Sequence, residues 1–142
     1  MTENNYWSSF RKYLVPRVYA WKISTAYTKG IPDWWGSGSF QDLWVENKRI
    51  AGNKEPPAFL DLTDEDKYLT YHQKTWLRNR HKEGRHVGVV VFSKAGHIYV
   101  PGLEWEKPIS KLDFLERAMP YKDLATKLIN ILGELPIEDQ VG

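Results

Sequence analysis

Two carboxylates and an ammonium group have the types and spacing of a metal-dependent phosphodiesterase site. Asp33 follows the turn sequence Gly30-Ile31-Pro32, and Glu46-Asn47-Lys48 begins thirteen residues later. If the second segment is a strand, alternation puts Glu46 and Lys48 on one face and Asn47 on the other. Such an arrangement brings cation ligands and a charge-stabilising group to one surface.

The residue types suit a hard divalent cation. Mg²⁺ prefers oxygen ligands and takes only one or two protein carboxylates, leaving room for water and phosphate. Asp33 and Glu46 meet that need, and the backbone carbonyl of Asn47 offers a further oxygen. Lys48 is then placed to orient the attacking water or to stabilise charge on the phosphorus transition state. The alternative is a cross-strand Glu–Lys pair beside an unrelated turn aspartate.

The elements around these residues are those of a hairpin. Residues 18–25 and 40–50 carry the aromatic and β-branched residues of strands, and Gly36-Ser37-Gly38-Ser39 is a strong turn signal between them. Strand–turn–strand geometry would bring Asp33 opposite Glu46.

The remaining patterns add helices and a buried strand. Pro16 ends a first helix over 4–14, and a helix over 70–83 has Thr70 and Gln73 as a capping box and Gly84 as its stop. The apolar run 87–92 predicts a strand buried on both faces, with a short partner over 97–100; helices follow over 111–118 and 121–132.

This order predicts a single α/β domain, a mixed central β-sheet flanked by helices. Residues 1–100 would form a catalytic core, and 101–142 a C-terminal helical extension ending in a flexible acidic tail from Glu134.

The same residues resemble the PD-(D/E)XK nuclease superfamily. Gly30-Ile31-Pro32-Asp33, Glu46-Asn47-Lys48, the helix bearing Gln73, Gly84 and the apolar strand are similar to its VRR-NUC branch, the virus-type replication–repair nucleases, over about residues 3–92. The resemblance implies a restriction-endonuclease-like fold, Mg²⁺ or Mn²⁺ at the acids, and hydrolysis of DNA phosphodiesters. It further implies a phage-encoded protein similar to Holliday-junction resolvases, some of which act as homodimers.

Two further site residues depend on this resemblance. Gln73 would contact Lys48, the water or a phosphate, but the capping box competes for the same side chain. Family members carry a glutamate in the first helix as an extra ligand on the metal side, and Glu3 is the sole acid before Asp33. An acid at that position is equally explained by the helix dipole.

Basic and aromatic residues suggest DNA contacts. Lys22 and Lys29 precede Asp33 within reach of a scissile phosphate, and a dense basic cluster lies at the end of the helix over 70–83: Arg78, Arg80, Lys82 and Arg85. The alternative is a cationic helix end stabilised by the dipole. Of Trp34 and Trp35, alternation predicts one in the core and the other as a stacking wall.

Composition narrows the class further. The chain of 142 residues has a net charge of +2 and no cysteine, which excludes disulfides and thiolate chemistry and suits a reducing cytoplasm, that of the host if the protein is phage-encoded. Signal-peptide, membrane-spanning and phosphate-loop patterns are absent. The sequence thus predicts a Mg²⁺-dependent deoxyribonuclease; the alternative is a catalytically inactive nuclease-fold module that binds DNA structures or a host protein.

Overall fold

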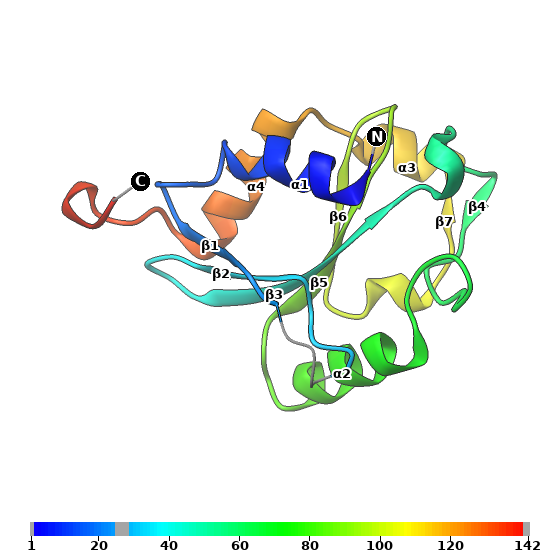
Figure 1. Cartoon of the computed structure of the whole chain (residues 1–142), viewed down its shortest axis with the longest axis horizontal. Helices are drawn as coiled ribbons and strands as arrows, with labels where there is room; N and C mark the ends of the chain where they lie inside the picture. The colour runs from blue at the N-terminus through cyan, green and yellow to red at the C-terminus, as the bar shows by residue number, and fades with distance from the viewer. Residues whose placement is uncertain (1, 25–28, 141–142) are drawn as a thin grey trace.

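A five-stranded mixed sheet forms the centre of the computed structural model, which describes residues 2–24 and 29–140 (Figure 1). The strand order is β1-β2-β3-β5-β6. Strands β3 and β5 pair in parallel, whereas the other neighbours are antiparallel. These five strands are β1 (Tyr19–Lys22), β2 (Trp34–Ser37), β3 (Asp42–Arg49), β5 (Val87–Phe92) and β6 (Ile98–Pro101). The predicted mixed α/β architecture is therefore confirmed.

The helices begin and end at the expected local signals. Thr70 and Gln73 form the predicted capping box of α2, and Gly84 follows the helix with a positive φ of 85°. The α-helices are α1 (Glu3–Arg11), α2 (Tyr71–Lys82), α3 (Lys111–Arg117) and α4 (Tyr121–Leu132). Short 3₁₀ turns are η1 (Ala51–Asn53), η2 (Glu104–Glu106) and η3 (Ile137–Asp139). Within the described ranges, none of the helices is long and apolar enough to cross a membrane.

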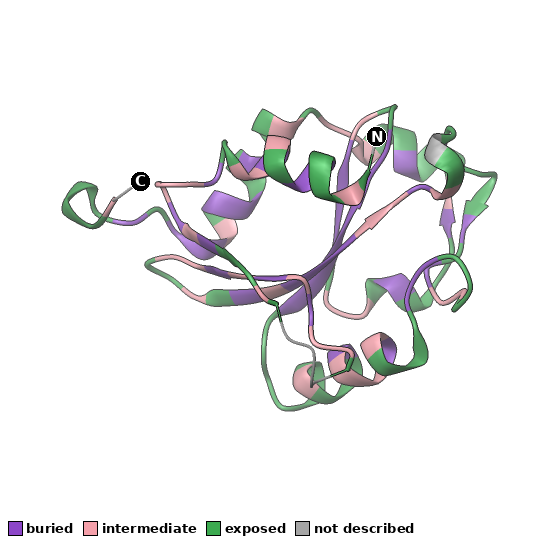
Figure 2. Ribbon diagram, viewed as in Figure 1, coloured by how far each residue is buried: buried purple, intermediate pink, exposed green. Residues whose placement is uncertain are grey.

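The sheet separates two apolar clusters. Helices α1 and α4 cover one face and α2 lies on the other (Figure 1), and β5 between them is buried along its length (Figure 2). Alternation along β5 divides its side chains: Val90 and Phe92 join the α1–α4 cluster, whereas Val89 and Val91 join the α2 cluster. All six residues of β5 are buried, as the apolar run predicts.

Several boundaries differ from the sequence-based expectations. Helix α1 ends at Arg11 and β1 at Lys22, and residues 25–28 of the predicted strand end and turn lie outside the described residues. A second, two-stranded sheet of β4 (Phe59–Leu60) and β7 (Ile109–Ser110) was not expected. Strands of two residues carry no periodicity that sequence reasoning could detect.

The C-terminal segment is part of the core. The apolar face of α4 packs with α1, and Leu128 and Leu132 are fully buried there. The start of the predicted flexible tail is bound to the segment before β1, because Glu134 pairs with Arg17 at 3.0 Å and the N–H of Leu135 donates to the Arg17 carbonyl.

Candidate functional site

The register of β2 and β3 places Asp33 opposite Glu46. Trp34 pairs with Val45, so the preceding residue, Asp33, faces Glu46 at the end of the ladder. The N–H of Ile23 donates to the Asp33 carbonyl at 2.7 Å, and the N–H of Asn47 donates to its Oδ2 at 2.8 Å. The predicted apposition of Asp33 and Glu46 is thus present, and Asp33 is held from both neighbouring strands.

The turn before Asp33 is fixed against α2. Gly30 has a φ of 82°, and a side chain there would overlap the backbone carbonyl of His72. Only a residue without Cβ adopts this conformation without strain in so little space. The first turn of α2 therefore sets the position from which the chain enters Asp33.

Glu46 is a buried acid without full hydrogen bonding. Its relative exposure is 1%, and its Oε2 has no hydrogen-bond partner among the described residues. Burial, a hydrogen bond with Asp33 and the nearby charge of that residue raise the pKa of Glu46 well above its ordinary value. A buried carboxylate oxygen left in this state is a natural ligand for a cation.

Lys48 lies beside Glu46 on the same strand face, as alternation predicts. Its Nζ is 4.0 Å from the Glu46 Oε2, which permits electrostatic attraction but is too long for a hydrogen bond. The Lys48 side chain retains 15% exposure. Its ammonium group therefore lies next to the buried carboxylate while keeping access to solvent.

The side chain and the backbone of Asn47 point in different directions: the side chain to one face of the sheet, the backbone groups to the β2 side of β3. Its side-chain Oδ1 accepts a hydrogen bond of 2.9 Å from the buried Nε1 of Trp34. Its N–H points at Asp33, and the carbonyl of a strand residue points to the same side as its N–H. The backbone carbonyl is therefore directed to the side where the predicted ligand was expected, whereas the amide side chain is not.

Glu3 lies beside the site from the first turn of α1. Burial and the charge of Asp33 raise the pKa of Glu3 above its ordinary value. The positive charges of Lys48, Lys22 and Arg49 oppose this rise but do not cancel it. The Nζ of Lys22 donates to the Oδ1 of Asn4 at 2.7 Å, next to Glu3. Within the described ranges no three His, Cys, Asp or Glu side chains form a metal-binding cluster. Glu3 therefore contributes charge near Asp33 and Glu46 without completing a three-carboxylate cage.

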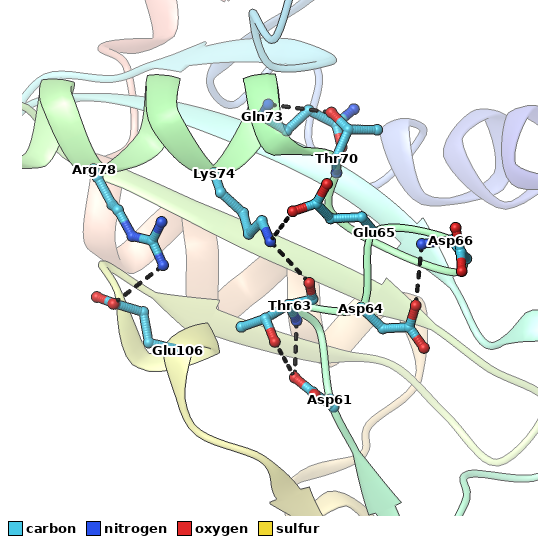
Figure 3. Close-up of polar contacts among 10 residues, drawn as sticks. All are labelled: Asp61, Thr63, Asp64, Glu65, Asp66, Thr70, Gln73, Lys74, Arg78 and Glu106. Atoms are coloured by element: carbon cyan, nitrogen blue, oxygen red, sulfur yellow. Dashed lines mark hydrogen bonds and ion pairs between the residues drawn. The ribbon is translucent and has the colours of Figure 1, made fainter.

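The structure gives Gln73 the capping role. Its Oε1 accepts from the N–H of Thr70 at 3.0 Å, while the N–H of Gln73 donates to the Thr70 hydroxyl at 3.2 Å (Figure 3). The predicted contact between Gln73 and Lys48 is therefore wrong, because the Gln73 amide oxygen that Lys48 would need already accepts the Thr70 N–H at the helix terminus.

A buried lysine on α2 was missed. The Nζ of Lys74 donates to the Thr63 carbonyl at 2.9 Å and pairs with Glu65 at 2.8 Å (Figure 3). It ties the acidic segment over 61–66 to α2. Lysine at a helical position normally indicates solvent, so the sequence offers no signal for this burial.

The predicted basic cluster divides around the end of α2. Arg78 lies 5.1 Å over the Trp105 ring and pairs with Glu106 at 3.5 Å, so it faces η2 (Figure 3). Arg80 pairs with Glu83 and lies 5.5 Å over the Trp76 ring. Arg85 lines a groove, and Lys82 and Lys29 are exposed.

The tryptophans divide as alternation predicts. Trp34 is fully buried among α1 and the sheet, whereas Trp35 is half-buried on the face that carries Glu46 and Lys48. Sequence reasoning missed that Trp21 and Trp44 are the cross-strand partners of Trp35.

Comparison with known proteins supports the fold. No family model matches the chain, and no curated protein matches it in sequence. In structure the chain is similar to Hjc of Archaeoglobus fulgidus, a Holliday junction resolvase from an archaeal hyperthermophile, with a TM-score of 0.53 and 15% identity. The alignment covers 87% of this chain and 99% of that chain.

At this identity the similarity shows the fold alone. The predicted fold class is confirmed as a resolvase-like or restriction-endonuclease-like α/β fold. The VRR-NUC branch and the phage origin stay predictions.

Proposed function

We propose that the protein is a divalent-metal-dependent DNA endonuclease that acts on branched DNA. The observation that carries the proposal is the buried Glu46 carboxyl group, whose Oε2 accepts no hydrogen bond among the described residues and which lies opposite Asp33 and 4.0 Å from the Lys48 ammonium. A buried carboxyl group with an incomplete set of hydrogen bonds is costly, so such an arrangement is expected where function requires it.

The donor set fits Mg²⁺ or Mn²⁺. Asp33, Glu46 and the carbonyl of Asn47 would hold the ion, which supplies Lewis acidity toward the phosphate when bound. Two protein carboxylates are enough for Mg²⁺, so the lack of a third carboxylate in the described site is compatible with this ion. Glu3 lies nearby, and its raised pKa reflects burial and the charge of Asp33, which a bound cation would offset.

The protein's own groups then act on the reacting phosphate. The partly exposed Lys48 ammonium is placed to orient the attacking water or to stabilise charge that develops on phosphate oxygens. Asp33 keeps its position because backbone groups of both adjoining strands bind it. Lys22 and Lys29 precede the site and would contact DNA phosphates without reading sequence.

The choice of branched DNA comes from the shared fold and from the predicted resemblance. Paired cuts across a four-way junction need two sites, so we expect a homodimer on that substrate. Sedimentation of the protein with and without a junction measures this.

The test is cleavage of a substrate panel with Mg²⁺, with Mn²⁺ and with EDTA. The panel contains a four-way junction, a nicked duplex, a single strand and an intact duplex. Cleavage should require the metal and should be lost in Asp33→Ala and Lys48→Ala while their circular dichroism stays native. Lys94→Ala, at an exposed lysine between β5 and β6, is the control and should cleave normally.

Undiminished cleavage by both site variants would contradict the proposed site. Metal-independent binding of junctions without cleavage of any substrate would instead favour the inactive DNA-binding module.

A further inference from the structure

Four tryptophans form a row across one face of the molecule. Trp21, Trp35 and Trp44 are direct cross-strand partners on β1, β2 and β3. Their ring centroids are 5.5 Å and 6.4 Å apart, and Trp76 of α2 continues the series 5.6 Å from Trp44. We call Trp21, Trp35, Trp44 and Trp76 the tryptophan row.

Core packing does not explain the exposed end of this row. Trp34, which neighbours Trp35 on the opposite face of β2, is completely buried, whereas Trp21 on β1 is 59% exposed. Trp35, Trp44 and Trp76 are each half-buried. Trp44 and Trp76 pack against the α2 cluster, so the aromatic surface open to solvent belongs to Trp21 and in part to Trp35. An exposed tryptophan that continues such a row is typical of a binding face.

The tryptophan row runs alongside the candidate site. Trp35 lies two residues after Asp33 on β2, and Trp44 lies two residues before Glu46 on β3. Two strand residues span about 7 Å, and residues two apart share a face. Trp35 and Trp44 therefore lie about 7 Å along their strands from Asp33 and Glu46. This is about the distance between neighbouring nucleotides of an extended DNA strand.

A groove beside the row offers an arginine that could bind a phosphate. A groove at its α2 end is lined by Trp44 together with Arg80, Arg85 and His86. Arg80 lies over the ring of Trp76 and pairs with Glu83 at 2.8 Å, so Arg85 is the cation that this groove offers to a phosphate. The groove also contains Asp42, whose carboxylate accepts a hydrogen bond of 2.6 Å from the Ser37 hydroxyl.

We propose that the tryptophan row binds unpaired bases of a DNA strand whose neighbouring phosphate lies at Asp33 and Glu46. Unpaired bases expose faces that stack on aromatic rings, whereas the bases of an intact duplex are covered by their neighbours. The inference rests on the proposed function and narrows its substrate to DNA with single-stranded nucleotides beside the cut. Arg85 in the groove would bind a phosphate of the same strand.

The test measures binding without cleavage. Fluorescence anisotropy in EDTA compares a labelled oligothymidylate of about 15 nucleotides with a blunt duplex of equal length. Trp21→Ala and Trp35→Ala should each raise the Kd for the single strand about tenfold and change the duplex Kd by less than about twofold. Trp21→Phe, which keeps an aromatic face, should restore most of the affinity.

Phe59→Ala is the matched control. Phe59 is 70% exposed on β4, away from the central sheet, so its loss should leave both Kd values unchanged. Circular dichroism confirms that each variant is folded.

Unchanged single-strand affinity in both tryptophan variants, or an equal loss for both DNA forms, would overturn the inference. A change from dimer to monomer in Trp21→Ala, with unaltered DNA affinity, would make the row a contact between two copies and overturn it as well. The binding test can succeed even if the protein does not cleave DNA, because single-strand binding by the row needs no cleavage. Failure of this inference and failure of the proposed function can therefore be told apart. Asp33→Ala should retain this binding.

Discussion

The N–H of Asn47 donates a 2.8 Å hydrogen bond to the carboxylate of Asp33, where the pairing of β2 with β3 ends. A side chain thus takes the place of the next strand residue at the end of the ladder. This contact fixes Asp33 against the strand that carries Glu46 and Lys48. The relative positions of the three charged groups therefore depend on backbone geometry more than on side-chain packing.

Glu46→Gln should stabilise the metal-free protein at pH 8. Folding raises the pKa of Glu46, so above the ordinary value of 4.5 the folded chain retains a proton that the unfolded chain has released. The contribution of Glu46 to stability is therefore present at lower pH and is lost as pH rises through the folded pKa. We expect a gain of about 1 kcal/mol at pH 8, the usual size of a stabilising substitution.

Urea unfolding in EDTA from pH 4 to pH 8 measures the difference. The gain should disappear as the pH falls toward 4.5, the ordinary pKa of the carboxyl group. Added Mg²⁺ should raise the Tm of the wild type and leave that of Glu46→Gln unchanged, because binding to the native state alone stabilises it. A variant less stable than the wild type at pH 8 would contradict this prediction.

Glu3→Gln should weaken the response to metal without removing activity. The Glu3 carboxylate interacts with Asp33 and Lys48 through space but does not belong to a three-carboxylate cluster in the described site. We expect the Mg²⁺ concentration for half-maximal cleavage to rise about tenfold, as for other residues that support a metal site indirectly. A Mg²⁺ titration measures this, and Glu116→Gln, at an exposed residue of α3, is the control. Loss of cleavage at saturating Mg²⁺ would instead make Glu3 a required ligand.

Gln73→Ala should lower stability by about 1 kcal/mol and leave cleavage intact. It removes the acceptor for the Thr70 N–H, one half of the capping box. Thr70→Ala removes the other half and is the matched variant. Thermal unfolding and initial cleavage rates are compared for both. Slower cleavage in Gln73→Ala alone, at equal stability, would restore the catalytic role that the resemblance suggested.

Gly30→Ala should cost about 2 kcal/mol or more and should slow cleavage. The new Cβ would meet both a positive φ and the backbone carbonyl of His72, so the turn must shift and carry Asp33 with it. Gly84→Ala is the control, because Gly84 has a similar φ of 85° but no atom within 4 Å of the added carbon. Equal losses of stability in the two variants would show that contact with α2 does not constrain the turn.

Local patterns predicted much of the site. Strand alternation placed Glu46 and Lys48 together, and the predicted hairpin brought Asp33 opposite Glu46, because both features depend on residues close in sequence. The turn itself was predicted at 36–39 but lies over 38–41, because Gly36 and Ser37 pair with β3 as the end of β2. The role of Gln73 was not decided in the same way. Capping and catalysis require the same residue type at the same helical position, and the sequence does not place α2 relative to β3.

The tryptophan row shows where sequence reasoning ends. Trp21 and Trp35 meet only through the register of β1 on β2, which depends on the whole sheet. The burial of Lys74 likewise depends on the loop over 61–66, which folds back over α2. Such contacts join segments that no short window of sequence contains.

The two apolar clusters on opposite faces of the central sheet allow the halves of the protein to be altered independently. Phe10 and Leu128 belong to one cluster, and Leu77 and Phe114 to the other, with the strands between them. Substitutions far apart and without shared partners have additive effects on stability. The α1–α4 side can therefore be redesigned for higher thermal tolerance while α2, which supports the Asp33 turn, keeps its native packing.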